Sequence, residues 1–380
     1  MIKEASAVII GGGIIGSSIA FNLLKMGMKD VSIFERSYIS SGSTGRCGGG
    51  IRQQWSSPMN VRLAMRSVKL FENFKIDVGN DIEYYQGGYL LLAYTDSEAD
   101  DFVKNVTMQK AQGLDVELLT PLMIKEKFPF LNIEGIKVGS WCQSDGHANP
   151  QIANIAYAIA IRKLGGDFNS HTEVKGIDVK NGEIIGVETD KGFVSTHTVI
   201  DTAGANSAKI GEMVDVKIPV YGERHQILIT EPVNHFLDPL VINFNHNYYV
   251  RQTHHGSLIM GQGDKNPAPG EDLGNTIEFL EEMAAKMTKD FPLLKKVHIV
   301  RQWSGAYDMS PDAQPVIDEA HELSRFIYAT GFSGHGFMLA PAVGEAVAEM
   351  VIHGKSMTMD ISNLKIDRFR EKVEKEHNVV

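Results

Sequence analysis

The sequence has few cysteines and no long apolar run. Only two of its 380 residues are cysteines, Cys47 and Cys142, too few for an iron–sulfur cluster, a four-cysteine zinc site or a secreted disulfide scaffold. No stretch of 18 apolar residues occurs, and the N-terminal apolar run stops at glycines, so neither a transmembrane segment nor a signal peptide is predicted. We therefore expect a cytoplasmic protein, with peripheral attachment to a membrane as the alternative.

Positive charge is also scarce. The chain carries 37 Lys and Arg against 47 Asp and Glu, a formal net charge of −10. Nucleic-acid-binding domains are usually basic, so no nucleic-acid partner is expected. The hydrophobic fraction of 43% is ordinary for a globular protein, and 380 residues are too many for one simple core, which indicates two closely joined domains.

The first 35 residues predict a strand, a helix and a second strand. Residues 5–10 are almost all apolar, which is typical of a strand buried on both faces of a parallel sheet. Residues 14–24 place apolar side chains at helical spacing, and residues 31–34 are again β-prone. The order and length match one βαβ unit.

A glycine motif lies between the first strand and the helix, Gly11-x-Gly13-x-x-Gly16. Gly11 permits the tight turn, Gly13 lets the backbone approach a pyrophosphate, and Gly16 lets helix and strand pack closely. Glu35 follows the second strand about 20 residues on, where a carboxylate accepts ribose hydroxyls. We predict a dinucleotide site, against the alternative of a merely tight turn.

Further clusters of small residues favour FAD over NAD. They lie at residues 42–50, 203–205 and 331–336. A long cofactor needs several close backbone approaches, and only small residues leave room for them. Ser43 and Thr44 are placed to donate hydroxyls to the pyrophosphate. The alternative is that these glycines only form turns.

The rest of the chain alternates helical and β-prone segments. Helices are expected over 58–77, 97–113, 120–128, 150–164, 276–289 and 341–353, strands over 227–230, 248–250, 258–260 and 326–328, a strand pair over 82–93, a hairpin at Asn181-Gly182, and a solvated helix beyond residue 365. The predicted fold class is α/β, or α+β overall. A Rossmann-like FAD-binding domain (1–80, 145–215 and 305–380) is interleaved with an antiparallel-sheet substrate domain (81–144 and 216–304).

The sequence resembles the D-amino-acid-oxidase-like FAD oxidoreductases. Within them it is most similar to the β subunits of dye-linked L-proline dehydrogenases and of heterotetrameric sarcosine oxidases. The matching stretches run in order along nearly the whole chain: Gly11-x-Gly13-x-x-Gly16 with Glu35, 42–54, 144–146, 202–205, 224–226, Pro311-Asp312 with Pro315, and 331–341. The resemblance implies a glutathione-reductase-type fold and FAD buried between two domains. It also implies a heteromeric partner in many relatives, with a homo-oligomer as the alternative, and in some relatives FMN at the subunit interface.

The motif, the glycine clusters and the resemblance together give the expected FAD-binding residues. They are Gly11, Gly13, Ile14, Gly16, Glu35, Arg36, Ser43, Thr44, Arg46, Cys47, Gly48, Gly49, Val174, Ala203, Gly204, Gly305, Gly331, Gly334, His335, Gly336, Phe337 and Met338. Cys47 is expected to be a packing residue rather than a reactive thiol.

The sequence departs from the resembled family at Met338. The sarcosine oxidase type carries a lysine just after its C-terminal Gly-Phe, and the monomeric sarcosine oxidases bind flavin through a cysteine. Here Met338 follows Phe337, and no thiol lies nearby. We therefore expect non-covalent FAD and a dehydrogenase rather than an oxygen-using oxidase.

Four residues are candidates for catalysis. His225 and Tyr249 align with a pocket histidine and a pocket tyrosine of the relatives, and Arg52 with a substrate-side arginine; His335 lies between glycines that are expected to approach the flavin. The alternatives are a core histidine, a core aromatic, a structural arginine and a turn histidine.

The substrate carboxylate needs a cation, preferably an arginine. Arg251 and Arg301 are weaker candidates for this role than Arg52. No metal site is predicted, because His254 and His255 are adjacent and would face opposite sides of a strand.

The predicted reaction is hydride transfer from Cα of a small amino acid to FAD. The expected substrates are secondary amines: proline, hydroxyproline or sarcosine. Two alternatives stay open. One is another FAD enzyme of the same fold, such as a primary amino-acid oxidase or a glycerol-3-phosphate dehydrogenase. The other is an FAD-bearing scaffold subunit that is inactive without its partner.

Overall fold

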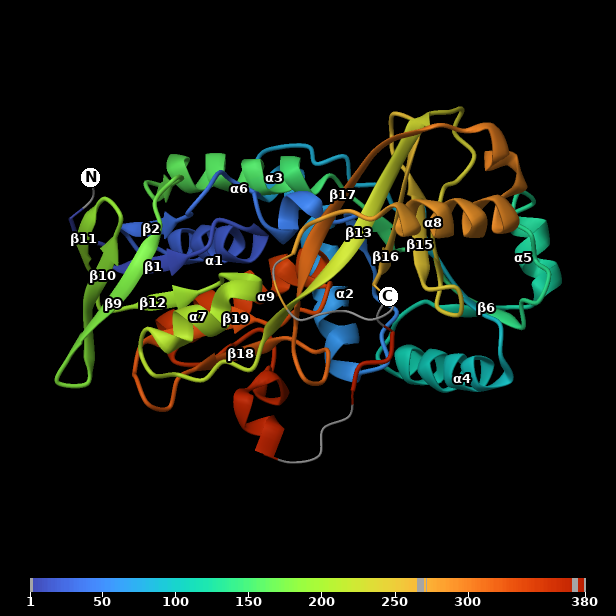
Figure 1. Ribbon diagram of the computed structural model, residues 1–380. Coiled ribbons are helices and arrows are strands. Elements are labelled where there is room, and N and C mark those ends of the chain that lie inside the picture. The colour runs from blue at the N-terminus through green and yellow to red at the C-terminus, as the bar shows by residue number, and fades with distance from the viewer. Residues whose placement is uncertain (1–2, 265–269, 271, 371–374, 379–380) are drawn as a thin grey trace.

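The computed structural model describes residues 3–264, 270, 272–370 and 375–378 (Figure 1). It contains the expected N-terminal unit: strand β1 (Ala7–Ile10), helix α1 (Ile14–Lys25) and strand β2 (Val31–Phe34). The two strands pair in parallel, with Ala7 opposite Val31. The βαβ prediction is therefore confirmed.

These strands lie in a sheet of six strands within the described residues, in the order β18-β19-β12-β1-β2-β8. The other members are β8 (Asp167–Asn169), β12 (Val199–Asp201), β18 (Val316–Glu319) and β19 (Phe326–Thr330). Neighbours run parallel except β18 and β19, which are antiparallel. Segments from the start, middle and end of the chain thus share one sheet.

Both faces of this sheet are covered, which explains the apolar run in β1. Ala7 and Ile9 pack into a core cluster shared with α1, α6 (Pro150–Lys163) and α9 (Gly336–His353). Val8 and Ile10 point the other way, into a cluster shared with an antiparallel three-stranded sheet. That sheet consists of β9 (Val174–Lys180), β10 (Glu183–Thr189) and β11 (Gly192–Ser195), and Asn181-Gly182 forms the predicted turn.

A second large sheet stands beside the first (Figure 1). Its order within the described residues is β17-β13-β16-β15-β14-β4-β6-β5. The strands are β4 (Tyr89–Ala93), β5 (Glu117–Leu119), β6 (Val138–Cys142), β13 (Tyr221–Pro232), β14 (Leu240–Asn243), β15 (Tyr248–Gln252), β16 (Ser257–Gly263) and β17 (Ile299–Met309). Neighbours are antiparallel except β14 and β4. The predicted fold class is confirmed.

Helices cover one face of this second sheet. Phe279, Met283 and Met287 of α8 (Ile277–Asp290) and Ile124 of α5 (Pro121–Lys127) pack into a cluster with Leu90 and Leu92 of β4. The remaining helices are α2 (Pro58–Glu72), α3 (Phe74–Asp77), α4 (Asp96–Ala111) and α7 (Ser207–Glu212). The two-stranded pair β3 (Gly50–Ile51) and β7 (Gly146–His147) lies outside both large sheets.

Several predicted boundaries are wrong. The helix expected over 58–77 breaks between α2 and α3, and the strand pair expected over 82–93 reduces to β4 plus one isolated bridge at Tyr85. The helix expected from residue 341 begins at Gly336, because Pro341 is accepted inside it. His254 and His255 lie in the turn between β15 and β16, not on a strand.

The prediction of a solvated helix beyond residue 365 is also wrong for the described residues. Residues Ile366–Arg370 form a short 3₁₀ helix, and residues 375–378 are not helical; 371–374 lie outside the described residues. Glu376 and Asn378 are almost fully buried. The charged composition predicted that this segment is exposed to solvent, but specific hydrogen bonds hold it against the rest of the protein.

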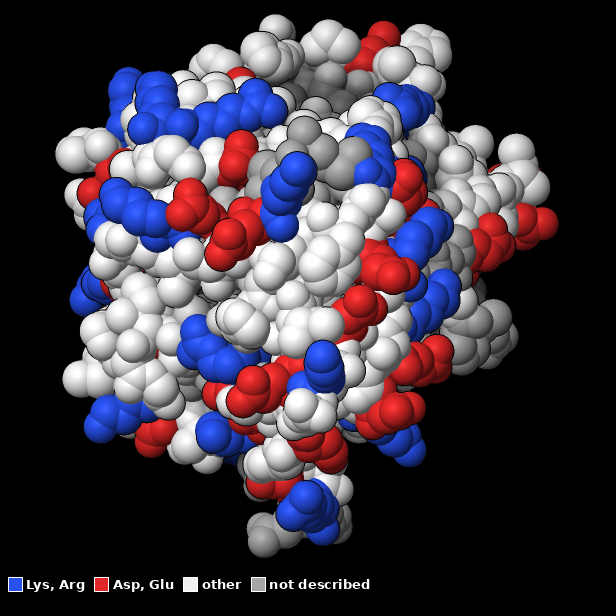
Figure 2. All heavy atoms as spheres, turned by 90° about the vertical axis from the view of Figure 1, so that its left-hand side faces the viewer, with Lys and Arg blue, Asp and Glu red and all other residues white. Residues whose placement is uncertain are grey.

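One helix among the described residues, α9, has the length and hydropathy of a membrane span. Of the residues of α9, 72% are buried inside the protein. The helix packs with α1 in the core cluster. We therefore interpret α9 as a core helix. On the face shown in Figure 2, several Lys and Arg side chains gather at the upper left, and over the rest of the face they are interspersed with Asp and Glu.

Candidate active site

A cavity of about 530 Å³ lies at the carboxyl ends of the parallel strands. Ile10, Phe34 and Thr202 line it from the ends of β1, β2 and β12, and Tyr307 of β17 lines it from the second sheet. Ligands of open α/β sheets bind at such strand ends. Its volume falls in the range of about 300–1,000 Å³ that is typical of small-molecule sites.

The glycine motif shapes the centre of this cavity. Gly11 has a φ of +111°, and a Cβ there would lie 2.5 Å from the Thr202 carbonyl oxygen; a Cβ on Gly16 would lie 2.3 Å from the Gly11 oxygen. Gly13 caps α1 without a side-chain hydrogen bond. The motif therefore serves the turn and the close packing, and it leaves the helix N-terminus facing the cavity.

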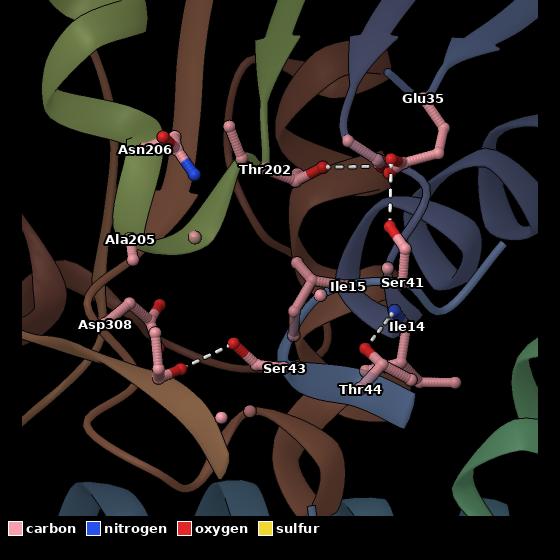
Figure 3. A pocket seen from close by; sticks show the side chains of 18 of the residues that line it. Ile14, Ile15, Glu35, Ser41, Ser43, Thr44, Thr202, Ala205, Asn206 and Asp308 are labelled. Atoms are coloured by element: carbon pink, nitrogen blue, oxygen red, sulfur yellow. Dashed lines mark hydrogen bonds between the residues drawn. The ribbon is translucent and has the colours of Figure 1, made fainter. Parts of the chain in front are cut away.

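Hydroxyl groups of the 3₁₀ helix η1 (Ser43–Arg46) surround this helix N-terminus (Figure 3). Thr44 Oγ1 accepts a hydrogen bond from the Ile14 N–H at 3.0 Å, and Ser43 Oγ donates to the Ala306 carbonyl oxygen at 2.6 Å. The second bond ties η1 to β17. Backbone N–H groups and hydroxyls at a helix N-terminus suit a phosphate group.

Glu35 marks one end of the cavity (Figure 3). Its carboxylate accepts hydrogen bonds from Gly12 N (2.9 Å), Ser37 N (2.8 Å) and Ser41 Oγ (3.2 Å). These bonds fix the carboxylate at the end of β2, with Val174 of β9 also lining this end. A fixed carboxylate here suits the ribose of a dinucleotide.

His225 and Tyr307 mark the other end. Their rings stack with centroids 3.4 Å apart and an interplanar angle of 13°, and both residues line the cavity. His225 Nδ1 is buried and has no hydrogen-bond partner among the described residues. Burial lowers the pKa of His225 below its usual 6.5, while Glu223 opposes this shift. The imidazole is therefore neutral at neutral pH.

The residues present fit FAD. The cavity runs from a fixed carboxylate, past the N-terminus of α1, to a buried histidine whose Nδ1 has no hydrogen-bond partner among the described residues. The first two features suit ribose and pyrophosphate. At the end with His225, the aromatic rings of Tyr307 and Phe337 line the cavity and suit a flat ring.

A second group does not line the cavity. Its Arg52 is close enough to the cavity residue Tyr307 for an electrostatic interaction. The Arg52 guanidinium lies over the Trp55 ring at 3.9 Å, and Trp55 meets the His335 ring at a centroid distance of 4.1 Å. Arg52 is 3% exposed, and burial lowers its pKa. Burial likewise lowers the pKa of His335 well below its usual value.

Arg52 has unused hydrogen-bonding capacity. Its Nη2 donates to the Asn378 carbonyl oxygen at 2.5 Å. Its Nε and Nη1 are buried and have no partner among the described residues. Buried charged donors are costly when unpaired, and an anion would pair them.

The other candidates have different surroundings. Tyr249 packs against Gly48 and Gly261, and burial raises its pKa well above 10, so it stays protonated. Arg251 is buried and its Nε donates to the Gly48 carbonyl oxygen, which holds the glycine loop. Arg301 is exposed on β17. It does not line the cavity.

Comparison with known proteins decides the family. Residues 6–350 match the profile of DAO, the FAD dependent oxidoreductases. This chain belongs to that family. The L-proline dehydrogenase from P. horikoshii is 39% identical, with a TM-score of 0.93 over 97% of this chain and 99% of that one.

Two curated relatives of this family match nearly the whole chain. The sarcosine oxidase subunit beta of Rhizobium meliloti (strain 1021) is 29% identical, over 95% of this chain and 88% of its own length. The human mitochondrial dimethylglycine dehydrogenase is 27% identical over 96% of this chain, which spans only 44% of that relative. The predicted FAD-dependent oxidoreductase is therefore confirmed.

Most of the predicted FAD-binding residues line the cavity. They are Gly11, Gly13, Ile14, Glu35, Arg36, Ser43, Thr44, Arg46, Cys47, Val174, Ala203, Gly204, Gly305, Gly334, Gly336 and Phe337. The others do not line it. Gly16 and Gly331 are close-packed behind it, Gly48 and Gly49 support the loop, and Met338 lies in the core. His335 faces Trp55, and its contact with flavin stays a prediction.

Some cavity residues escaped the sequence analysis. Tyr307 and Asp308, the turn residue Asn206, and Thr172 on the ribose side all line it. Tyr307 could have been found, because it lies two residues after Gly305 on a strand and shares its face. Thr172 had no local signal, since it reaches the cavity only through the pairing of β8 with β2.

Proposed function

We propose that this chain uses FAD to oxidise a small amino acid with a secondary amine, such as proline, hydroxyproline or sarcosine. The observation that carries the proposal is the buried Arg52, whose Nε and Nη1 have no partner among the described residues. A carboxylate accepts charge-assisted hydrogen bonds from such free guanidinium donors.

The relatives support the class of substrate. Their names describe enzymes of proline, sarcosine, dimethylglycine and glycine, which all carry a carboxylate next to the carbon that bears the amine. Several of these amines are alkylated. An identity of 39% or less does not single out one of them, and we favour proline because its dehydrogenase shares both the fold and the highest of these identities.

His225 supports the chemistry at the amine. An amine gives up hydride from Cα only when its nitrogen is neutral, so a nearby base helps. His225 lines the cavity, has a free Nδ1 and is neutral because burial lowers its pKa. When bound, FAD accepts the hydride. In this proposal the chain supplies Arg52 for the carboxylate, His225 as the proton acceptor, and the aromatic wall of Tyr307 and Phe337. Of these residues, Arg52 lies outside the lining of the cavity.

We further propose that FAD is bound without a covalent link. Cys47 lines the cavity, but burial raises the pKa of its thiol to about 11, so the nucleophilic thiolate is scarce. The division into an FAD-binding and a substrate domain also stays a proposal. It is supported by the two sheets, although β17 crosses the predicted boundary at residue 305.

The assembly and location are proposals as well. Two relatives are named as β subunits of sarcosine oxidase, which supports a heteromeric partner; FMN at the interface is an expectation from the resemblance alone. We propose a cytoplasmic location.

The test is anaerobic reduction of the bound flavin. The purified chain, loaded with FAD, is mixed with L-proline, D-proline, hydroxyproline, sarcosine or glycerol 3-phosphate, and absorbance near the flavin maximum is followed. Bleaching by a secondary amino acid is expected. Bleaching by glycerol 3-phosphate alone would overturn the proposal, and bleaching only after addition of a partner subunit would identify a dependent subunit. Hydrogen peroxide formed stoichiometrically in air would contradict a dehydrogenase.

A further inference from the structure

The guanidinium of Arg52 is held by the end of the chain. The Asn378 carbonyl oxygen accepts the Nη2 hydrogen bond of Arg52 at 2.5 Å. The Asn378 side chain also donates to the Gln54 carbonyl oxygen at 3.3 Å. More than 300 residues of sequence separate the two segments, so this contact exists only in the folded protein.

Glu376 anchors this segment. Its carboxylate is 1% exposed and accepts hydrogen bonds from Ser56 N (2.8 Å), Ser57 N (3.1 Å) and Asn60 Nδ2 (3.1 Å). These donors lie at the N-terminus of α2, which begins six residues after Arg52. Negative charge is favourable at a helix N-terminus.

The anchor is joined directly to the arginine clamp. Asn378 N donates to Glu376 Oε1 at 3.1 Å, which orients the Asn378 carbonyl toward Arg52. Glu376 N donates to the Asp312 carbonyl oxygen at 2.9 Å, and this fixes the segment on a third part of the fold. On its other side, Arg52 is covered by the Trp55 ring.

The guanidinium is thus restricted from two directions. One Nη2 hydrogen is bonded to the carbonyl and one face of the guanidinium is covered by the indole, so Nε and Nη1 are left as free donors for a ligand. The long side chain of an arginine has many rotamers, and restricting them on binding lowers the affinity. A hydrogen-bonded pair with a ligand is therefore strongest when the arginine is already held in one rotamer.

We propose that Glu376 and the Asn378 carbonyl are positioning groups of the substrate site, which orient Arg52 for the carboxylate of the amino acid. This inference rests on the proposed role of Arg52. Neither group contacts the cavity, so the segment sets affinity for the carboxylate and leaves the hydride step unchanged.

The test compares two buried carboxylates that both accept backbone N–H bonds. Glu376→Gln replaces one acceptor oxygen by an NH₂ group and removes the charge. The matched control is Glu349→Gln, since Glu349 is also buried and accepts from Met357 N (2.7 Å) and Thr358 N (2.9 Å), away from Arg52. Asn378→Ala is a milder second variant that removes only the bond to Gln54.

Three quantities are measured on the FAD-loaded proteins: KM and kcat for the amino acid, the Kd of pyrrole-2-carboxylate from tryptophan fluorescence, and the flavin content. Glu376→Gln is expected to raise KM and Kd about 10-fold, because the Asn378 N–H loses its hydrogen bond to a charged carboxylate. The kcat and the flavin content should stay within twofold of the wild-type values. Asn378→Ala should raise both constants about threefold, and Glu349→Gln should leave them unchanged.

The outcomes separate this inference from the proposed function. The positioning role is overturned by the following combination of results. The wild type binds pyrrole-2-carboxylate, Arg52→Met abolishes that binding, and neither Glu376→Gln nor Asn378→Ala weakens it. A fall in kcat or flavin content equal to the rise in KM would indicate a structural role only and would also overturn it. If Arg52→Met binds the carboxylate as the wild type does, the proposed function and this inference fail together. If Glu376→Gln does not fold, Asn378→Ala decides.

Discussion

Replacement of Arg52 tests the proposed site most directly. Its Nε and Nη1 are buried and have no partner among the described residues, and a substrate carboxylate would accept hydrogen bonds from such donors. Arg52→Met removes both bonds and keeps an apolar side chain of similar length over Trp55. Arg52→Lys keeps the charge but only one donor group.

The magnitudes follow from the number of bonds. A hydrogen bond to a charged group contributes about 1.5–3 kcal/mol. Loss of one bond in Arg52→Lys should lower kcat/KM about 10- to 150-fold, since about 1.4 kcal/mol corresponds to a factor of ten. Loss of both in Arg52→Met should cost about 3–6 kcal/mol, or roughly 150- to 25,000-fold.

The assay compares L-proline with L-prolinamide, which lacks the carboxylate. With prolinamide, Arg52→Met should change kcat/KM less than about threefold, because no interaction is left to lose. Arg66→Met is the control, because Arg66 of α2 pairs with Glu345 of α9 and neither residue lines the cavity. Equal losses for the two substrates would refute the carboxylate role, and so would full activity of Arg52→Met on proline.

Four other predictions concern the cofactor and the base. Gly16→Ala should lower the melting temperature and the FAD content, because its Cβ would lie 2.3 Å from the Gly11 oxygen, whereas Gly176→Ala, with its nearest contact at 3.7 Å, should not; normal FAD content in Gly16→Ala would contradict the packing argument. Glu35→Ala should raise the Kd of FAD about 10- to 100-fold in a calorimetric titration, through loss of a charged ribose acceptor, and an unchanged Kd would exclude that role. The wild-type kcat/KM should fall as pH drops through the pKa of His225, which burial lowers below 6.5, because the protonated ring cannot accept the amine proton; His225→Asn should lose this acid limb, and a limb that persists would point to another base. Acid precipitation should release all FAD into the supernatant, since the Cys47 thiol, with a pKa of about 11, forms no flavin link, and flavin retained on the protein pellet would disprove this.

The N-terminal unit could be predicted from the sequence because its signals are local. The apolar run of β1 reflects burial on both faces. The glycine motif is recognisable from its spacing within six residues, although Gly11 and Gly16 pack against Thr202. The same holds for the hairpin at Asn181-Gly182, where positive φ angles select those residues. Such features depend on backbone geometry that a few residues determine.

The catalytic end could not be predicted to the same depth. His225 and Arg52 were candidates by resemblance, but their ordinary alternatives, a core histidine and a paired arginine, differ only in the partners that the fold supplies. Tyr307 stacks on His225 because β13 and β17 are paired in one register, with His225 opposite Gly305.

The end of the chain shows the limit most clearly. By composition, the sequence alone predicted a solvated tail, whereas in the structure Glu376 lies at the N-terminus of α2 and Asn378 bonds to Arg52. The sequence determined the dinucleotide motif and the two-sheet class, because periodicity and glycine placement act within a segment. Only the tertiary structure decided which buried charges have partners and which stay free for a ligand, because those contacts join residues that are hundreds of positions apart.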